Sequence, residues 1–345
     1  MRVIYARNVN DALLKGLDLF QHETNYYVQE SRNGTTYEAK EPITTVYLKP
    51  WERVCLIAAR DANPFLHFIE SLWMLAGRKD LAPLTYFVKS MADFSDDGET
   101  LWGAYGWRWQ SYFNKDQVSI IIGMLKKNPD DRRCVLQMWD PILDLNKQGK
   151  DVPCNTNIYF KIREDKLNMT VCCRSNDMLW GAYGTNVVHM SVLQEYMATM
   201  IGVEMGEYRQ VSDSFHVYAE TSVWNKVKDL KIDPYNYRVY SNPYDNLHGY
   251  KQSPLITNLT SFHWELDRFF NIHPNDMDHE GWENPIFKDI AVPMTITYSK
   301  HKNKDYSVHE ALNEIKPMDW KTACFDWIRK RDMSYNNAEK GETHE

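Results

Sequence analysis

The chain has 345 residues, of which 43% are hydrophobic and 13% aromatic. A chain of this size and apolar content can bury a large core, so global disorder is excluded and one large domain or two are expected. The 40 Lys and Arg and 47 Asp and Glu residues give a net charge of −7, which argues against a nucleic-acid binder that depends on bulk positive charge, so no DNA binding is expected. No membrane-length apolar run and no signal-peptide core occur, so we expect a protein of the cytoplasm without a membrane partner.

The six cysteines indicate neither a disulfide scaffold nor a zinc site, because no C-x-x-C pair occurs among them, and no metal is expected. A single cysteine of a cytosolic enzyme is a candidate nucleophile. Composition alone does not identify it among Cys55, Cys134, Cys154, Cys172, Cys173 and Cys324.

The first third of the chain contains one strong helix signal. Residues 30–43 are polar and rich in turn-forming residues, and Thr44–Lys49 alternates like a strand. Asp61-Ala-Asn-Pro-Phe is a helix start, and the segment Phe65–Ala76 that follows is almost wholly apolar and runs into Gly77. This pattern predicts a buried helix in which Glu70 is the only acid.

Strand and helix signals then alternate without a regular βαβ order. Residues 92–100 are predicted to form an acidic loop, the loop-rich part begins at about residue 234, and the charged last ten residues are expected to fray. The irregular order favours an α+β fold. The predicted elements are a helix over Val118–Lys127, a strand over Val135–Trp139, a hairpin of Asn157–Ile162 and Leu167–Cys173, a helix over Asn186–Ile201 ended by Gly202, and an element beginning at Phe215–Tyr218.

The predicted hairpin brings one cysteine next to an arginine. Cys154 precedes its first strand and Arg174 follows its second strand, so the two residues meet at its open end. An arginine beside a thiol lowers the pKa of the thiol and favours the nucleophilic thiolate. The alternative is that Cys154 is a small buried residue and Arg174 an exposed strand end.

Motifs around this pair resemble those of the thymidylate synthase family. They occur in the family's order over residues 30–220, and six motifs in register are far more specific than any one of them. The resemblance implies an α+β fold with a large twisted mixed sheet flanked by helices, a sheet face at a dimer interface, and one domain over 1–345 whose part 219–345 has low resemblance. The motifs are Cys154 with Arg174-Ser-x-Asp177, the helix headed by Asn186, His216-Val-Tyr218, Glu70 in Phe-Ile-Glu-Ser-Leu-Trp, Tyr105-Gly with Arg108-Trp109, and Asp131-Arg-Arg.

The resemblance also implies a reaction and a role for each motif residue. A pyrimidine nucleoside monophosphate would be activated at C5 by addition of the Cys154 thiolate to C6, and 5,10-methylenetetrahydrofolate would supply one carbon. An obligate homodimer with a shared phosphate site is implied. The residues are Cys154, Glu70, Tyr105 and Asn155 for catalysis; Arg32, Arg174 and Ser175 for the phosphate, with Arg132 and Arg133 from the other subunit; Asn186 for the base; His216 and Tyr218 for the ribose; and Asp177 for the folate. The alternatives are a Glu70 that merely pairs with an arginine, and packing roles for His216 and Tyr218.

Several departures from the family favour a hydroxymethylated product. Asn155 stands where synthases usually carry histidine, and Met91 and Phe94 fall where the family places two tryptophans against the folate. The family's closing C-terminal residues have no counterpart, and 127 residues follow Tyr218. Without the tryptophan shield, water would reach the exocyclic methylene before hydride, as in the hydroxymethylases of the superfamily, which are chiefly phage-encoded.

Alternatives remain open for the product and the base. Trp102 or Trp180 could replace the shield, which would give a thymidylate synthase. Asn186 favours dUMP. It lies nine residues after Asp177, one more than the family's usual spacing, so a dCMP hydroxymethylase stays an alternative. A non-catalytic nucleotide- or RNA-binding homologue, or a cysteine hydrolase using His189 or His216, is a more distant reading.

Overall fold

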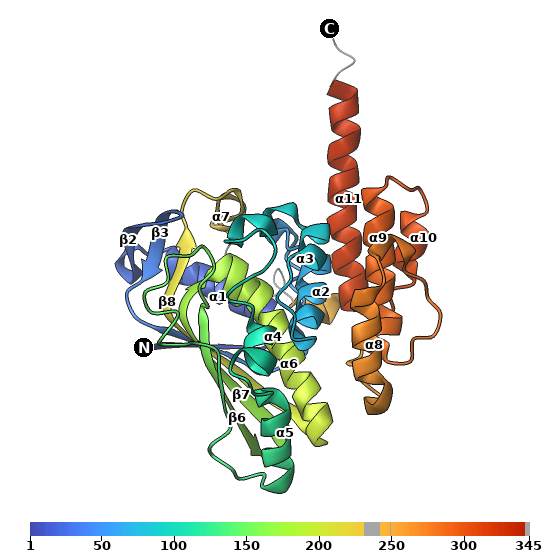
Figure 1. Ribbon diagram of the computed structural model, residues 1–345. Helices are drawn as coiled ribbons and strands as arrows, with labels where there is room; N and C mark the ends of the chain where they lie inside the picture. The colour runs from blue at the N-terminus through green and yellow to red at the C-terminus, as the bar shows by residue number, and fades with distance from the viewer. Residues whose placement is uncertain (231–241, 249, 342–345) are drawn as a thin grey trace.

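A single mixed β-sheet of eight strands organises the chain in the computed structural model, which describes residues 1–230, 242–248 and 250–341 (Figure 1). Its strand order is β1-β4-β8-β7-β6-β5, with β3 pairing to β8 and β2 to β3. The β1/β4 and β7/β8 pairs are parallel and the others antiparallel, which confirms the expected mixed sheet. The strands are β1 (Arg2–Ala6), β2 (Tyr26–Ser31), β3 (Gly34–Ala39), β4 (Ile43–Tyr47), β5 (Val135–Gln137), β6 (Asn155–Arg163), β7 (Lys166–Asp177) and β8 (Glu204–Tyr218).

Helices cover one face of this sheet and continue into a second helical group. Figure 1 shows α1 and α6 against the strands, α2 and α3 beside them, and α8 to α11 grouped on the far side of α2. The helices are α1 (Val9–Phe20), α2 (Pro64–Leu75), α3 (Ala82–Phe87), α4 (Tyr105–Trp107), α5 (Gln117–Lys127), α6 (Asn186–Ile201), α7 (Ser222–Val227), α8 (Leu259–Asn271), α9 (Val292–Lys302), α10 (Val308–Asn313) and α11 (Met318–Gly341).

The core lies between the sheet and α6. Alternate residues of β7, namely Leu167, Met169 and Val171, are buried, as period-two alternation requires of a strand with one covered face. Helix α6 is buried on every side from Asn186 to Ala198, which is the mark of a helix enclosed between layers. Polar residues on α6 are therefore forced to find partners inside the protein.

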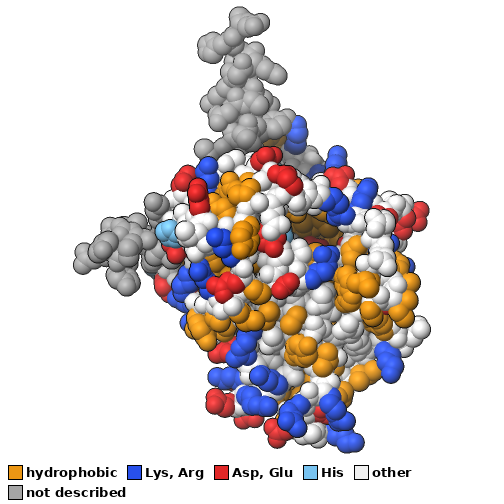
Figure 2. Space-filling view, turned by 90° about the vertical axis from the view of Figure 1, so that its left-hand side faces the viewer, with side chains coloured by type: hydrophobic (Ala, Val, Ile, Leu, Met, Phe, Trp, Pro, Cys, Tyr) orange, Lys and Arg blue, Asp and Glu red, His pale blue; other side chains and the backbone are white. Residues whose placement is uncertain are grey.

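The opposite face of the sheet is less covered. Exposed hydrophobic side chains occur at alternate positions of β1 (Val3 and Tyr5) and on β5 and β6 (Val135 and Tyr159). Figure 2 turns the left-hand side of Figure 1 toward the viewer and shows hydrophobic side chains in several patches on that side. This surface is where the sequence led us to expect a dimer interface, which stays a prediction.

Several sequence expectations are confirmed in detail. The buried helix begins after Asn63, whose side chain caps it, and runs to Leu75. The long helix ends at Gly202, which has a φ of 92° that suits glycine. The hairpin turns at Glu164 and Asp165, whose φ angles of 53° and 55° fit a tight two-residue turn.

Other expectations are wrong. Phe215–Tyr218 ends the long strand β8 instead of beginning an element, whereas the turn-rich residues 30–43 do contain the turn of the β2–β3 hairpin. The part after residue 234 is mainly helical where it is described, because α8 buries Phe262, Leu266 and Phe269 at helical spacing among polar residues. Of the last ten residues, which were expected to fray, 336–341 belong to α11 and 342–345 lie outside the described residues.

Candidate active site

Cys154 and Arg174 meet at the open end of the β6–β7 hairpin, as the sequence predicted. The Arg174 backbone N–H donates to the Cys154 carbonyl oxygen at 2.9 Å, and Nη2 of Arg174 lies 3.8 Å from the Cys154 Sγ. The same guanidinium donates to the carbonyl oxygens of Pro153 at 2.8 Å and Val152 at 3.0 Å. A β-bulge at Thr156 interrupts the pairing just after the cysteine, and bulges of this kind re-aim side chains near active sites.

Burial dominates the electrostatics of this thiol. It raises the pKa of Cys154, while Arg174 and Arg32 act in the opposite direction and Asp151 adds to the increase. Arg174 thus lowers the Cys154 pKa as expected, but burial outweighs this effect and the net shift is upward. Arg32 is held nearby by hydrogen bonds from its guanidinium to the carbonyl oxygens of Gly149 at 2.8 Å and Lys150 at 2.9 Å.

A chain of side-chain amides runs inward from the cysteine. The Asn155 backbone N–H donates to the Tyr105 hydroxyl at 3.3 Å, and Asn155 Nδ2 donates to Asn186 Oδ1 at 3.4 Å. Asn186 Nδ2 donates to Asn176 Oδ1 at 3.1 Å, and Asn176 Nδ2 donates to Ser212 Oγ at 2.9 Å. The structure thus brings Tyr105, Asn155 and Asn186 together, and it adds Asn176, the variable position of Arg-Ser-x-Asp.

The extra residue before Asn186 is taken up by a π-helical segment. Met178–Thr185 forms it, with non-helical backbone angles at Tyr183 and Gly184, and α6 then starts at Asn186. Gly181 lies within this segment, and a Cβ there would stand 2.4 Å from Asn176 Oδ1 and 3.1 Å from Asn186 Nδ2. The insertion therefore leaves Asn186 at the head of its helix and in contact with Asn155.

Asp177 has a structural role, and its expected role in binding the folate stays a prediction. Its Oδ1 accepts hydrogen bonds from the backbone N–H groups of Leu179 at 2.6 Å and Trp180 at 2.7 Å, so it caps the π-helical segment. Burial raises the pKa of Asp177, against the effect of these hydrogen bonds and of nearby His216. Trp180 stays 52% exposed, with the Arg60 guanidinium 5.5 Å from its ring.

Glu70 faces a histidine and not an arginine. Its Oε2 lies 3.2 Å from Nε2 of His189 on α6, one turn along from Asn186. The alternative of a glutamate that merely pairs with an arginine finds no support among the described residues. Helices α2 and α4 approach closely here, because Gly106, the residue after Tyr105, packs directly on the Met74 carbonyl group.

The expected ribose residues lie at the end of β8. His216 is paired in register with Asp177, and its Nδ1 lies 3.3 Å from the carbonyl oxygen of Ser214. The Tyr218 hydroxyl accepts a hydrogen bond from Asn33 Nδ2 at 3.3 Å. Ser175, beside Arg174, is the register partner of Ser214. Their roles stay predictions.

The two arginines expected from another subunit lie apart from this group. Arg133 is 83% exposed and pairs with Asp131 at 2.7 Å, and Arg132 is exposed. Within residues 1–230, 242–248 and 250–341, neither arginine forms a hydrogen bond or ion pair with the surroundings of Cys154. Their exposure is what a contribution to a neighbouring subunit requires.

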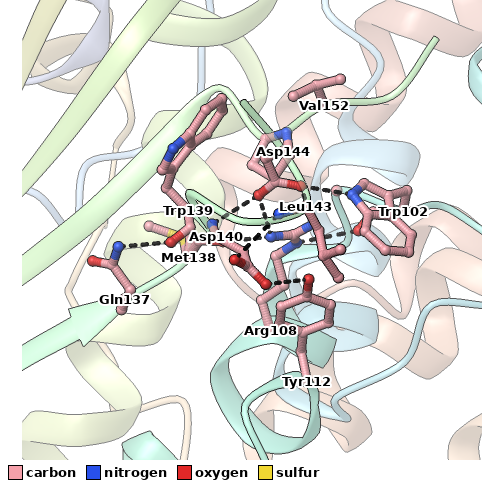
Figure 3. A network of polar contacts seen from close by, with 12 residues as sticks. Trp102, Arg108, Tyr112, Gln137, Met138, Trp139, Asp140, Leu143, Asp144 and Val152 are labelled. Atoms are coloured by element: carbon pink, nitrogen blue, oxygen red, sulfur yellow. Dashed lines mark hydrogen bonds and ion pairs between the residues drawn. The ribbon is translucent and has the colours of Figure 1, made fainter. Parts of the chain in front are cut away.

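A buried ion pair anchors the segment that leads to Cys154 (Figure 3). Arg108 and Asp144 are fully buried, with Nη1 2.7 Å from Oδ2 and Nη2 2.9 Å from Oδ1. The Trp102 indole N–H donates to Asp144 Oδ1 at 2.7 Å, and Arg108 also donates to the Met138 carbonyl oxygen at 2.7 Å. Further along, the Gly103 N–H donates to Asp151 at 2.7 Å. Burial of either charge without the other would cost free energy, so the two side chains stay paired. The pair and its hydrogen bonds therefore hold residues 138–151 in place.

The residues considered for a folate shield occupy different environments. Met91 packs against the core and Phe94 is 50% exposed, both in the short 3-10 helix Lys89–Phe94. Trp102 is committed to Asp144 and to edge contacts with Trp107 and Tyr112. Of the two tryptophans, Trp180 is therefore the one beside Asp177.

Within the described part of the chain, no group of three or more His, Cys, Asp or Glu side chains is arranged to hold a metal ion. None of the described helices is long and apolar enough to cross a membrane.

Comparison with known proteins places these features in context. Residues 21–253 match the sequence profile of the family described as thymidylate synthase. The chain is 44% identical over 345 residues to a deoxyuridylate hydroxymethyltransferase of Pseudomonas phage M6, covering 97% of this chain and 96% of that protein. It is 39% identical over 190 residues to a protein of the same name from Bacillus phage SP01, covering 52% and 50%. It is 28% identical over 230 residues to a putative thymidylate synthase of Methanosarcina mazei, covering 66% and 94%.

Proposed function

The chain belongs to the thymidylate synthase family, and we propose from that premise that it converts dUMP to 5-hydroxymethyl-dUMP through a covalent bond between Cys154 and C6 of the base. The observation that carries this proposal is the contact of Cys154 with Arg174 at one end of an amide chain that includes Asn186. The names of the phage relatives support the hydroxymethylated product and uracil as the base. A dCMP hydroxymethylase and a synthase that makes dTMP are the alternatives, and a non-catalytic nucleotide- or RNA-binding homologue is a remote one.

The proposed chemistry needs no oxidation or reduction. The Cys154 thiolate adds to C6 and converts the base to an enolate whose C5 is nucleophilic. 5,10-Methylenetetrahydrofolate supplies the methylene carbon to C5 when it is bound. Loss of the C5 proton, with cleavage of the bond between the transferred carbon and the folate nitrogen, releases tetrahydrofolate and leaves an exocyclic methylene on the base. Water adds to this methylene, and expulsion of the thiolate from C6 completes the turnover. The balance is dUMP, methylenetetrahydrofolate and water giving 5-hydroxymethyl-dUMP and tetrahydrofolate.

We assign the nucleotide phosphate to the positive charge near Cys154. Arg174 and Arg32 provide it within the chain, with Ser175 as a hydroxyl ligand. Both guanidiniums also hold backbone oxygens of residues 149–153, so binding of a phosphate and placement of the cysteine are coupled. Arg132 and Arg133 complete the site from the second subunit of an obligate homodimer, whose interface is the less covered face of the sheet. This concentration of arginines lets an acidic protein bind a dianion.

Asn186 would read the base and His216 and Tyr218 the ribose. A carboxamide both donates and accepts, which matches O4 and N3–H of uracil, whereas the exocyclic amine of cytosine calls for an acceptor alone. The contacts of Asn186 with Asn155 and Asn176 support the assignment, because they restrict its orientation. Asp177 and Trp180 border the side on which the folate would bind, and the exposed half of the Trp180 ring offers it a stacking surface. The protein would act in the cytoplasm of a host cell.

The test is to incubate the protein with dUMP or dCMP and methylenetetrahydrofolate and to identify the nucleotide products by mass. We expect 5-hydroxymethyl-dUMP from dUMP. Cys154→Ser should abolish turnover, whereas Cys172→Ser, a matched change on the neighbouring strand, should retain it. Formation of dTMP would favour the synthase, and turnover of dCMP alone would contradict the assignment of Asn186.

A further inference from the structure

A buried histidine stands behind the glutamate of the site. His189 and Glu70 come from two packed helices, α6 and α2, and their side chains lie 3.2 Å apart at Nε2 and Oε2. The His189 side chain is 2% exposed and that of Glu70 is 12% exposed. Glu70 is therefore the member of the pair that solvent or a substrate reaches, and His189 contacts it from the protein side.

His189 makes no other polar contact among the described residues that would explain its burial. Neither ring nitrogen of His189 makes a hydrogen bond within the described residues, and its polar contact is the 3.2 Å approach of Nε2 to Oε2 of Glu70. A buried imidazole without partners costs free energy of desolvation, which packing alone does not offset. The Glu70 carboxylate lies among buried apolar neighbours on its own helix, namely Phe68, Ile69 and Leu72, with His67 and Ser71 as the polar exceptions.

The position of the pair connects it to the reacting base. His189 lies three residues after Asn186, so both project from the same side of α6. Asn186 contacts Asn155, the residue after Cys154. The order Cys154, Asn155, Asn186 and then His189 leads to Glu70, which places the carboxylate at the edge of the proposed pyrimidine site.

We propose that His189 is a positioning residue that holds the Glu70 carboxylate in the orientation in which it takes protons during one-carbon transfer, an inference that rests on the proposed function. A small rotation of the imidazole aligns Nε2–H with Oε2, which lies 3.2 Å away, so that it donates to this oxygen and leaves Oε1 for proton transfer. Glu70 then takes the proton that C5 loses, passes it to the departing amine of the folate, and takes a proton from the water that adds to the methylene. His189 itself gains and loses no proton in these steps.

The test uses tritium release from [5-³H]dUMP in the presence of methylenetetrahydrofolate, because the C5 proton is lost whether the product is methylated or hydroxymethylated. His189→Leu removes the donor, and His189→Gln restores a donor at about the same reach. His67→Leu is the matched control, since His67 is a buried histidine on α2, one turn before Glu70. Affinity for dUMP is measured by equilibrium dialysis.

We expect His189→Leu to release tritium about 100-fold more slowly, the scale of a lost general base, with affinity for dUMP within about threefold of the wild type. His189→Gln should release tritium at least about tenfold faster than His189→Leu, and the rate of His67→Leu should stay within about threefold of the wild-type rate. A His189→Leu rate within threefold of the wild type, or a His189→Gln variant as slow as His189→Leu, contradicts the inference. Absence of tritium release from the wild-type protein would instead contradict the proposed function.

Discussion

The guanidinium Nη2 of Arg174 lies 3.8 Å from the sulfur of Cys154, across the open end of one hairpin. This proximity lowers the pKa of the thiol, yet burial outweighs it and the net shift is upward. The ordinary pKa of a thiol is about 8.5, and that of Cys154 lies above its ordinary value. Arg174 therefore offsets part of the effect of burial on the Cys154 pKa.

Alkylation of Cys154 by iodoacetamide should therefore speed up as pH rises, with a midpoint above about 8.5. Arg174→Gln removes a charge that stabilises the thiolate, so its midpoint should move to still higher pH and its rate at pH 7.5 should fall. Peptide mass mapping measures the rate at this cysteine alone. Arg163→Gln, a change at the far end of the same hairpin, serves as the control. A lower midpoint in Arg174→Gln would show that the guanidinium does not favour the thiolate.

Gly181→Ala should weaken binding of dUMP. The added Cβ would stand 2.4 Å from Asn176 Oδ1 and would push the Asn176 and Asn186 amides out of register. Loss of one well-made hydrogen bond corresponds to about a tenfold increase in Kd. Gly123→Ala on α5, where a Cβ meets nothing within 4 Å, is the matched control and should leave the Kd unchanged. Titration calorimetry with dUMP gives both values, and equal affinities would remove Gly181 from the base site.

Asp144→Asn should destabilise the protein by about 3 to 5 kcal/mol, because it leaves the Arg108 charge buried without its partner. Chemical denaturation measures the loss, and limited proteolysis should show faster cleavage within residues 138–151. Asp130→Asn is the control, since its exposed carboxylate only approaches Arg163 at 3.8 Å, and no change in the unfolding midpoint is expected. An Asp144→Asn protein as stable as Asp130→Asn would mean that the network does not anchor the segment.

Asp319→Asn should make the folding stability of the protein less dependent on pH between about pH 4 and pH 6. Burial raises the pKa of Asp319, at the start of α11, to about 6, although its Oδ2 accepts a hydrogen bond from Tyr244 at 3.1 Å. The folded state holds this proton where the unfolded chain, with a pKa of about 3.9, has lost it, so the contribution of Asp319 to stability falls as pH rises through this window.

The free energy of unfolding of the variant, relative to that of the wild type, should rise by about 2 to 3 kcal/mol from pH 4 to pH 7. The variant is therefore expected to gain stability relative to the wild type as the pH rises. Urea denaturation at the two pH values measures it. Asp326→Asn, a half-exposed position on the same helix, should show no such trend. A pH-independent difference for Asp319→Asn would place its pKa near the ordinary value.

The parts of the site that the sequence predicted are those fixed by local pattern. The apolar run around Glu70 and the hairpin between Cys154 and Arg174 each follow from residue type and spacing, and the structure has both. The direction of the pKa shift of Cys154 could not be predicted from residue spacing, because it depends on how much of the fold covers the sulfur. The partner of Glu70 was missed for the same reason, since His189 lies 119 positions away and meets it through helix packing.

One feature that was not predicted, helix α8, could have been recognised from the spacing of its hydrophobic residues. Phe262, Leu266 and Phe269 recur at helical spacing in the segment taken for a loop, and only its many polar residues obscured the helix. Asn176 gave no such signal, because a polar residue on a strand is read as exposed until its neighbours are known. The extra residue before Asn186 was evident, but its accommodation in a π-helical segment was not.

The most direct test of the proposed reaction is a single turnover with dUMP and methylenetetrahydrofolate in H₂¹⁸O, followed by mass analysis of the nucleotide and absorbance analysis of the folate. We predict 5-hydroxymethyl-dUMP that carries one ¹⁸O atom, together with tetrahydrofolate. Formation of dTMP with dihydrofolate would contradict the proposal, because it would mean that hydride, and not water, reaches the methylene on the Cys154-bound base.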